Sequence, residues 1–310
     1  MHLTTQGAGL DSSRLAALEA GLAAIGAADS AVEVIVSDDF AGTVRQITRD
    51  PDYGANRGAG VVGAKTIATD NGSVIVLNAP EFRRRGTADL ERILAHEGGH
   101  VLLNRRRETV TGRRHLAGEA EWRWLLLCIG ALAIDEFRVE RALAELGYPP
   151  PESCDLDHFE ATMFAVNTEI LSACIDPASR SPRHFAQRVI HTQDWLSKYL
   201  AYAAPFYPGG PPRTEASQLA RANWDDYVGN HWDERVALYR TLPSARTPVG
   251  DSEVDAALHA ALDLEIALLA SLGFEFTSER DGEGFWRRGT DRRWLRRENR
   301  HRQAMDDDAA

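Results

Sequence analysis

Hydrophobic positions in the first part of the chain change from helical to strand spacing. Residues 11–26 place apolar side chains three and four positions apart, which predicts a helix capped by Asp11 or Ser12 at its start and by Gly26 at its end. Stretches rich in β-branched residues predict short strands at 31–37, 61–69 and 73–78. The turn residues at 70–72 separate the last two strands and predict a hairpin.

Helical spacing returns at Thr87, which we expect to cap a helix. The apolar stripe of this helix consists of Leu90, Ile93, Leu94, Val101 and Leu102. After a basic connector, a longer helical pattern runs from about 118 to 146 and ends at Gly147, before three prolines at 149–151. We interpret this proline cluster as a domain boundary.

The rest of the chain has mostly helical spacing. It predicts helices at about 156–174, 182–203, 214–241 with a break, and 251–272. Residues 274–286 indicate a hairpin that turns at Asp281-Gly282, followed by an arginine-rich tail that is either helical or disordered. The expected fold class is α+β, with a first domain at 1–148, a helical domain at 152–272, and a hairpin and tail at 273–310.

Composition narrows the class of protein. The chain has 310 residues, of which 44% are hydrophobic and 26% charged, values typical of a globular protein. Its three cysteines, Cys128, Cys154 and Cys174, show no CxxC spacing, which favours a reducing compartment over a disulfide framework. The first residues lack the basic segment of a signal peptide, and the longest apolar run, 124–134, is short of a spanning helix. We therefore expect a cytoplasmic protein with no membrane segment.

An H-E-x-x-H pattern occupies residues 96–100, inside the helix predicted from Thr87. Residues four apart lie one turn apart on the same helix face, so His96 and His100 can bind one metal ion. Glu97 then lies beside the open coordination position of that metal. Catalytic zinc usually has three protein ligands and one water, so the sequence should contain a third ligand.

Glu136 is the third ligand that we predict. Along the longer helix, Glu136 and Glu140 interrupt the apolar stripe formed by Leu125, Ile129, Leu132 and Leu143. Carboxylates on an apolar face need partners that offset their desolvation. We expect Glu136 to bind the metal and Glu140, one turn later, to hydrogen-bond a ligand imidazole. Buried salt bridges between these glutamates and the connector arginines are the alternative.

Other acidic positions compete for the third place. Glu119 and Glu121 are closer to the motif in sequence, although they lie where a helix start favours acids. A later polar cluster fits an N-cap and first helical turn as well as a metal site; it contains Asp155, Asp157, His158 and Glu160.

The chain at this point resembles the zincin metallopeptidases, specifically the gluzincin group, in which H-E-x-x-H is completed by a glutamate on a later helix, often as E-x-x-x-D. Here that second motif would be Glu136-Phe-Arg-Val-Glu140, and the run EFRVERALAELG looks like the third-ligand helix of M48-type peptidases. The order of strand, hairpin and helix before His96 also looks like the ImmA/IrrE-type proteases. The resemblance covers roughly residues 30–147 and implies a zincin-like catalytic domain.

Carried over residue by residue, the resemblance makes His96, His100 and Glu136 zinc ligands and Glu97 the general base of peptide hydrolysis. It also implies a peptide or protein substrate that pairs with an edge strand, for which 61–69 is the candidate. Zincins often add an oxyanion donor, and the candidates are His184, His191, Tyr199 and Tyr202.

Arginines are clustered in an otherwise acidic chain with a net charge of −11. Residues 83–114 and 287–302 contain nine and eight arginines. These clusters could steer an acidic substrate or bind nucleic acid, but interleaved acids make nucleic acid unlikely as a partner and favour ion pairs within the protein. A regulatory binding protein on a zincin fold and a nucleic-acid-associated protein are the rival functions. The sequence leaves the oligomeric state open.

Overall fold

The computed structural model describes residues 2–6, 10–29, 31–57, 60–70, 72–210, 215–279 and 282–308. The strands are β1 (His2–Gln6), β2 (Val32–Ser37), β3 (Asn56–Arg57), β4 (Gly60–Val61), β5 (Ala64–Thr69), β6 (Gly72–Asn78), β7 (Phe274–Glu279) and β8 (Gly282–Arg287). The α-helices are α1 (Ser12–Ile25), α2 (Phe40–Thr48), α3 (Ala79–Arg84), α4 (Thr87–Arg106), α5 (Glu121–Glu145), α6 (Leu156–Ile175), α7 (Pro182–Ala203), α8 (Gln218–Tyr227), α9 (Trp232–Thr241), α10 (Asp251–Leu272) and α11 (Asp291–Asp308). Short 3₁₀ turns lie at Arg114–Ala117, Glu152–Cys154, Pro177–Arg180 and Gly229–His231.

The chain is α+β and folds into two compact units that are discontinuous in sequence. Unit 1 contains residues 1–109, 135–149 and 243–250, and unit 2 contains 110–134, 150–242 and 251–310. Helix α5 contributes its first part to unit 2 and its last part to unit 1. One crossing between the units, between residues 149 and 150, falls at the proline cluster that the sequence analysis used as a boundary.

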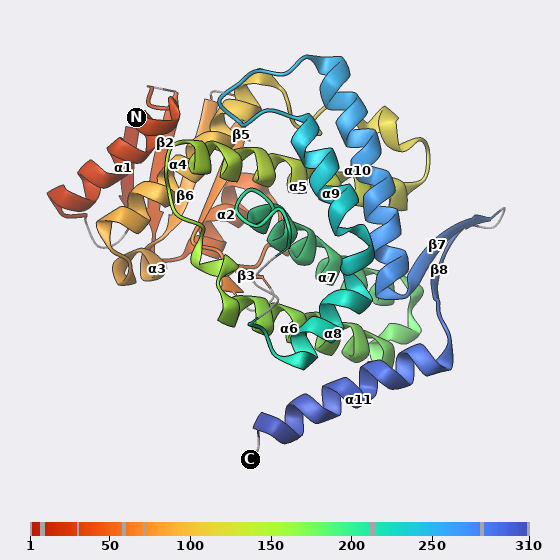
Figure 1. The fold of residues 1–310 in the computed structure, drawn as a ribbon. Helices are drawn as coiled ribbons and strands as arrows, with labels where there is room; N and C mark the ends of the chain where they lie inside the picture. The colour runs from red at the N-terminus through yellow and green to blue at the C-terminus, as the bar shows by residue number, and fades with distance from the viewer. Residues whose placement is uncertain are drawn as a thin grey trace. The chain divides into compact units, whose positions relative to one another are not determined.

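Unit 1 is built on a four-stranded sheet of order β1-β2-β6-β5 (Figure 1). Strands β1, β2 and β6 are parallel, and β5 pairs antiparallel with β6 through the predicted hairpin, with Thr66 opposite Ile75. Because side chains alternate across a strand, Ala64 and Thr66 face one side of the sheet while Lys65 and Ile67 face the other. This alternation decides which residues of β5 can meet the helix that carries the H-E-x-x-H motif.

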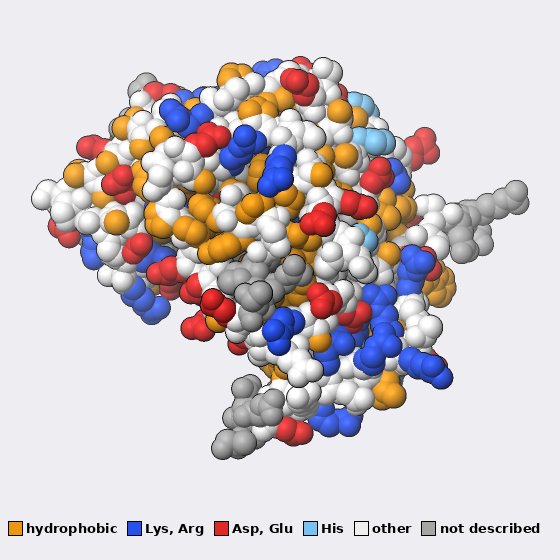
Figure 2. All heavy atoms as spheres, in the orientation of Figure 1, with side chains coloured by type: hydrophobic (Ala, Val, Ile, Leu, Met, Phe, Trp, Pro, Cys, Tyr) orange, Lys and Arg blue, Asp and Glu red, His pale blue; other side chains and the backbone are white. Residues whose placement is uncertain are grey.

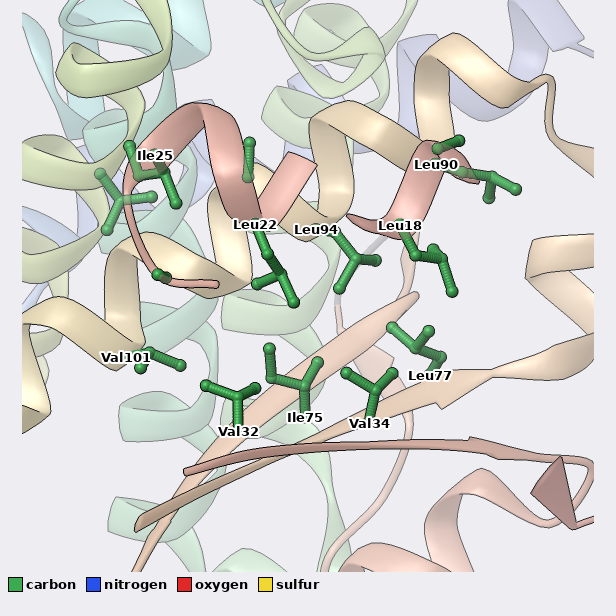
Figure 3. Close-up of a cluster of buried hydrophobic side chains, with 14 of the residues drawn as sticks. Leu18, Leu22, Ile25, Val32, Val34, Ile75, Leu77, Leu90, Leu94 and Val101 are labelled. Carbon is green, nitrogen blue, oxygen red and sulfur yellow. The ribbon is translucent and has the colours of Figure 1, made fainter. Parts of the chain in front are cut away.

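Helices α1 and α4 cover one face of this sheet. Figure 3 shows Leu18 and Leu22 of α1 and Leu94 of α4 meeting strand residues such as Val34 and Ile75 in one buried apolar cluster. The opposite face packs against α2 through Phe40 and Val44, which are buried with strand residues in a second cluster. Burying both faces explains why apolar residues occupy successive positions at 34–36 in β2 and at 74–77 in β6.

Glycines allow α4 to approach its neighbours closely. A methyl group on Gly98 would lie 2.6 Å from Ile25 Cγ2, and one on Gly99 would lie 2.8 Å from Val139 Cγ2. Both distances are shorter than a van der Waals contact, so no larger residue fits these positions without displacing a neighbour. The two glycines of the H-E-x-x-H motif are therefore set by packing, with α1 on one side and the last part of α5 on the other.

Residues 243–250 complete unit 1 although they lie far from the rest of it in sequence. The guanidinium of Arg138 donates hydrogen bonds to the carbonyls of Pro243 and Thr247 and forms a buried ion pair with Glu108, at 2.7 Å. The Glu108 carboxylate also accepts from the main-chain N–H of Val249. This segment thus supplies the polar partners that a buried arginine and a buried glutamate require.

Unit 2 contains helices α6 to α10, the β7–β8 hairpin and α11. Helix α6 packs against α7, α8 and α11, and the buried interior includes Phe159, Trp224 and Tyr227. A buried polar cluster of this unit joins α7, α9 and α10. Arg235 and Glu265 pair at 2.6 Å, and Gln193 donates a hydrogen bond to the same carboxylate.

The arginine-rich tail is a helix, α11, and one carboxylate anchors it. Arg293, Arg297 and Arg300 all pair with Asp226 of α8, at 3.3, 2.9 and 2.7 Å. In the first arginine cluster most guanidiniums also have acidic partners, as in the pairs of Arg83 with Asp38 and of Arg106 with Glu108. Figure 2 shows Lys and Arg side chains gathered along and beside α11. Internal ion pairing therefore accounts for much of the arginine content.

The predicted helices and the two predicted hairpins are present, although Asn71, Arg280 and Asp281 of the hairpin turns lie outside the described residues. Several details differ from expectation, among them helix α3 and the β3–β4 pair, which were not predicted. Gly86, one residue earlier than Thr87, is the N-cap of α4, because its carbonyl accepts from the N–H of Leu90 while Asp89 accepts from its N–H. Leu125 of the predicted stripe is 43% exposed. Strand β1 and helix α2 were not predicted. Among the described residues, no helix is long and apolar enough to span a membrane.

We predict that Gly99→Ala lowers the free energy of unfolding. The added methyl group overlaps Val139, and overpacking of this kind costs about 1–3 kcal/mol. Urea unfolding followed by circular dichroism measures the change. Gly54→Ala is the control because, apart from its chain neighbours, no heavy atom of the described residues lies within 4 Å of the position of the added methyl group. A Gly99→Ala protein as stable as the wild type would contradict the close contact between α4 and α5.

A second prediction concerns Asp226 and pH. Burial alone would raise the pKa of Asp226, but the hydrogen bonds and charges of Arg297, Arg300 and Arg293 outweigh it and lower the pKa. A carboxylate with a lowered pKa in the folded state stabilises the protein above its unfolded pKa, near 3.8, and this stabilisation is lost as the pH falls through the folded pKa.

The Asp226→Asn variant should accordingly be less stable than the wild type by roughly 1–3 kcal/mol at pH 6. The difference should shrink as the pH is lowered below 3.8. Urea unfolding at a series of pH values tests this, with Asp263→Asn, an exposed acid on α10, as the matched control. A difference that does not change with pH would contradict the ion-pair account.

Candidate metal centre

Three potential metal ligands converge inside unit 1. His96 and His100 lie one turn apart on α4, and Glu136 lies on the part of α5 that packs against Gly99. Their ligand atoms all lie within 4.8 Å of one another. Glu136 Oε2 is 3.1 Å from Nε2 of each histidine, and the two Nε2 atoms are 3.2 Å apart. Among the described residues this is the group of histidine and acidic side chains whose geometry could hold a metal ion.

The donor set and its spacing fit a zinc ion. Two imidazoles and one carboxylate are a usual ligand set of catalytic zinc, which keeps a fourth position for water. Tetrahedral bonds of about 2.0–2.1 Å place neighbouring donor atoms about 3.3 Å apart, close to the 3.1 and 3.2 Å separations observed here. The three side chains are little exposed, at 12, 15 and 8% for His96, His100 and Glu136.

Glu140 orients the first imidazole. Its Oε1 atom lies 2.8 Å from His96 Nδ1, which leaves Nε2 of the same ring directed at Glu136 and His100. The other carboxylate oxygen of Glu140 accepts a hydrogen bond from Arg92, one turn before His96 on α4. Arg92 also donates a hydrogen bond to the carbonyl of Pro149, so it links α4 to the residues that follow α5. Such partners of a ligand imidazole fix its tautomer and its ring orientation.

Charges within the cluster shift the pKa values of its members. Burial alone would lower the pKa of His96, but hydrogen bonds and charges from Glu136 and Glu140 raise it to about 10. The pKa of His100 is also raised, because the charge and hydrogen bond of Glu136 outweigh burial. For Glu136 itself, burial alone would raise the pKa, but His100 and His96 hold it well below its usual value. The three groups therefore form one electrostatically coupled unit.

Glu97 lies next to this cluster and is 6% exposed. Its Oε2 atom accepts a hydrogen bond of 2.6 Å from the hydroxyl of Thr66 on β5. Among the described residues, no hydrogen bond is formed to the other carboxylate oxygen, Oε1. The site thus combines two imidazoles and a carboxylate that could hold a metal with a second carboxylate, of which one oxygen atom is hydrogen-bonded within the described part of the chain.

Three residues near the cluster of His96, His100 and Glu136 were not predicted from the sequence. Thr66 is a polar residue on the core-facing side of β5, a signal that becomes readable once the register is known. Arg92 falls four residues before His96, at the spacing of residues on one helix face. Asp135 is buried beside Glu136, and burial raises its pKa to about 7, with the charges of His100 and Arg138 opposing that rise.

The competing ligand positions lie outside the cluster. Glu119 and Glu121 are exposed. Asp155 is the N-cap of α6 and accepts from the N–H of His158, as expected for a helix start. The oxyanion-donor candidates all belong to α7 of unit 2, and their roles stay predictions; they are His184, His191, Tyr199 and Tyr202.

We predict that Glu136→Gln weakens zinc binding at least about 100-fold, because it replaces a charged ligand, whereas loss of an orienting partner usually costs 10–100-fold. Competition with a chromogenic chelator measures the affinity, and circular dichroism checks the fold. Glu119→Gln should bind zinc as the wild type does, since Glu119 is exposed and outside the cluster. Equal affinities for the Glu136 variant and the wild type would move the third ligand elsewhere.

Comparisons with protein families, with curated proteins and with solved structures found no significant match to this chain. A function for this chain is therefore inferred from the geometry of five residues: His96, Glu97, His100, Glu136 and Glu140.

Proposed function

We propose that this chain is a zinc-dependent metallopeptidase that hydrolyses peptide bonds. The observation that carries the proposal is the convergence of the ligand atoms of His96, His100 and Glu136, together with the charge of the neighbouring Glu97, which acts on His100. Two imidazoles and a carboxylate match the ligand set of catalytic zinc, and the position of Glu97 matches that of a general base. The resemblance of the two motifs to gluzincin peptidases supports the same assignment.

In this proposal His96, His100 and Glu136 hold the metal. When bound, zinc would act as a Lewis acid that lowers the pKa of a water molecule toward 7 and polarises the carbonyl under attack. Glu97 takes a proton from the attacking water through Oε1 and returns it to the leaving amine. Glu140, supported by Arg92, keeps the His96 ring in the tautomer that presents Nε2 to the metal.

An extended substrate is proposed to bind along the outer edge of β5, the edge that is not paired with β6. Strand β5 is the outermost strand of the unit 1 sheet on this side, within the described part of the chain. An added strand obtains main-chain hydrogen bonds from such an edge. Thr66 of this strand contacts Glu97, so a peptide paired with β5 would lie close to the proposed general base. The three cysteines form no disulfide bond with one another, which supports a cytoplasmic location as part of the proposal.

We predict that Glu97→Gln keeps zinc but loses at least about 100-fold in kcat, because general-base catalysis contributes about 10²–10⁴-fold. Metal analysis should give about one zinc per chain for both proteins, and a peptide library followed by mass spectrometry reports cleavage. Glu19→Gln, an exposed change on α1, is the control with wild-type activity expected.

Two outcomes would contradict the proposal. One is a folded protein that binds no zinc. The other is a zinc-bound wild type that cleaves no member of the library, which would favour the rival hypothesis of a regulatory binding protein. Cleavage that persists unchanged in Glu97→Gln would remove Glu97 from the mechanism.

A further inference from the structure

Thr66 is the residue through which the sheet of unit 1 meets the proposed general base. Its hydroxyl lies 2.6 Å from Glu97 Oε2 and 3.0 Å from the main-chain carbonyl oxygen of Glu97. A threonine hydroxyl has one proton and can donate only one hydrogen bond at a time. The shorter distance is typical of a hydroxyl donating to a carboxylate, so the side chain of Glu97 is the main acceptor.

We propose that Thr66 is a positioning residue that fixes the orientation of the Glu97 carboxylate for catalysis, an inference that rests on the metallopeptidase proposal. Among the described residues, Thr66 is the hydrogen-bond partner of this carboxylate. With Oε2 held by the hydroxyl, rotation of the carboxyl group is restricted. The oxygen Oε1 is then presented to the attacking water in one orientation.

The contact between Thr66 and Glu97 has a second consequence, because Thr66 lies on β5. Strand β5 pairs along its whole length with β6, which lies in the interior of the sheet, so the hydroxyl of Thr66 is fixed by a rigid element. The other edge of β5 is the edge to which the substrate is proposed to add. One strand therefore orients both the substrate backbone and the general base, and the relative position of the two is set by the backbone of β5. Small misplacements of reacting groups can cost about 100-fold in rate.

Kinetics of two Thr66 variants test the inference. Thr66→Val keeps the shape of the side chain and removes the hydroxyl, and we expect kcat to fall about 10–100-fold with KM changed by less than about 3-fold. Thr66→Ser restores the hydroxyl and should restore kcat to within about 3-fold of the wild type. Thr241→Val is the matched control, because Thr241 is an exposed residue at the end of α9 whose hydroxyl donates to the carbonyl of Leu238 in the same helix. Zinc affinity should be equal in all of these proteins.

Unfolding of the metal-free protein tests the contact without any activity measurement. Thr66→Val should raise the unfolding equilibrium constant about 10-fold when Glu97 is present. In a Glu97→Ala background the same change should have less than about 2-fold effect, because the acceptor carboxylate is gone. The main-chain carbonyl of residue 97 remains in that background, so an undiminished effect would assign the hydroxyl to the main chain and overturn the inference.

The outcomes separate this inference from the proposal on which it rests. A wild type that binds zinc and hydrolyses nothing removes the metallopeptidase function, and the unfolding cycle then decides whether Thr66 holds Glu97. An active wild type whose Thr66→Val variant keeps its kcat, or shows a raised KM with kcat unchanged, overturns the positioning role and leaves the metallopeptidase function intact.

Discussion

The close contact between α4 and the last part of α5 is the constraint on which the candidate centre depends. Gly99 leaves room for Val139, and this approach brings Glu136 and Glu140 within reach of the two imidazoles on α4. An apolar contact thereby sets the distances between polar groups. The polar contacts between the two helices, such as the pair of Arg92 with Glu140, add to this packing. The same reasoning applies to Gly98, which allows α1 to pack against the opposite side of α4.

The polar groups of the site are arranged as a chain of partners of alternating charge. Arg92 pairs with Glu140, Glu140 with His96, and His96 and His100 both with Glu136. Each buried carboxylate in this chain has a cationic or imidazole partner, which offsets its desolvation. Glu97 differs because its partner is the neutral hydroxyl of Thr66. His100 and His96 hold the pKa of Glu136 well below its usual value although burial alone would raise it, so Glu136 is held in its ionised form.

Sequence reasoning identified the helices well because their apolar periodicity is strong. The shared face of His96 and His100 follows from helical spacing, and Glu136 and Glu140 were predicted because they interrupt the apolar stripe of their helix. Thr66 could not be found in this way, because its contact with Glu97 depends on strand register and on which face of the sheet α4 covers. The membership of residues 243–250 in unit 1 was equally inaccessible, since it depends on hydrogen bonds from the buried side chain of Arg138 to main-chain carbonyls, which leave no periodic pattern.

The return of residues 243–250 to unit 1 has a consequence for biosynthesis. A ribosome releases the chain from its N-terminus, so the strands, α4 and Glu136 emerge long before Pro243. During that interval Arg138 and Glu108 have each other as partners but lack the main-chain groups of the later segment. The unit that contains the candidate centre is therefore completed late in translation, after most of unit 2 has been synthesised. Truncation between residues 150 and 242 removes part of the polar interior of unit 1 even though every proposed metal ligand is still present.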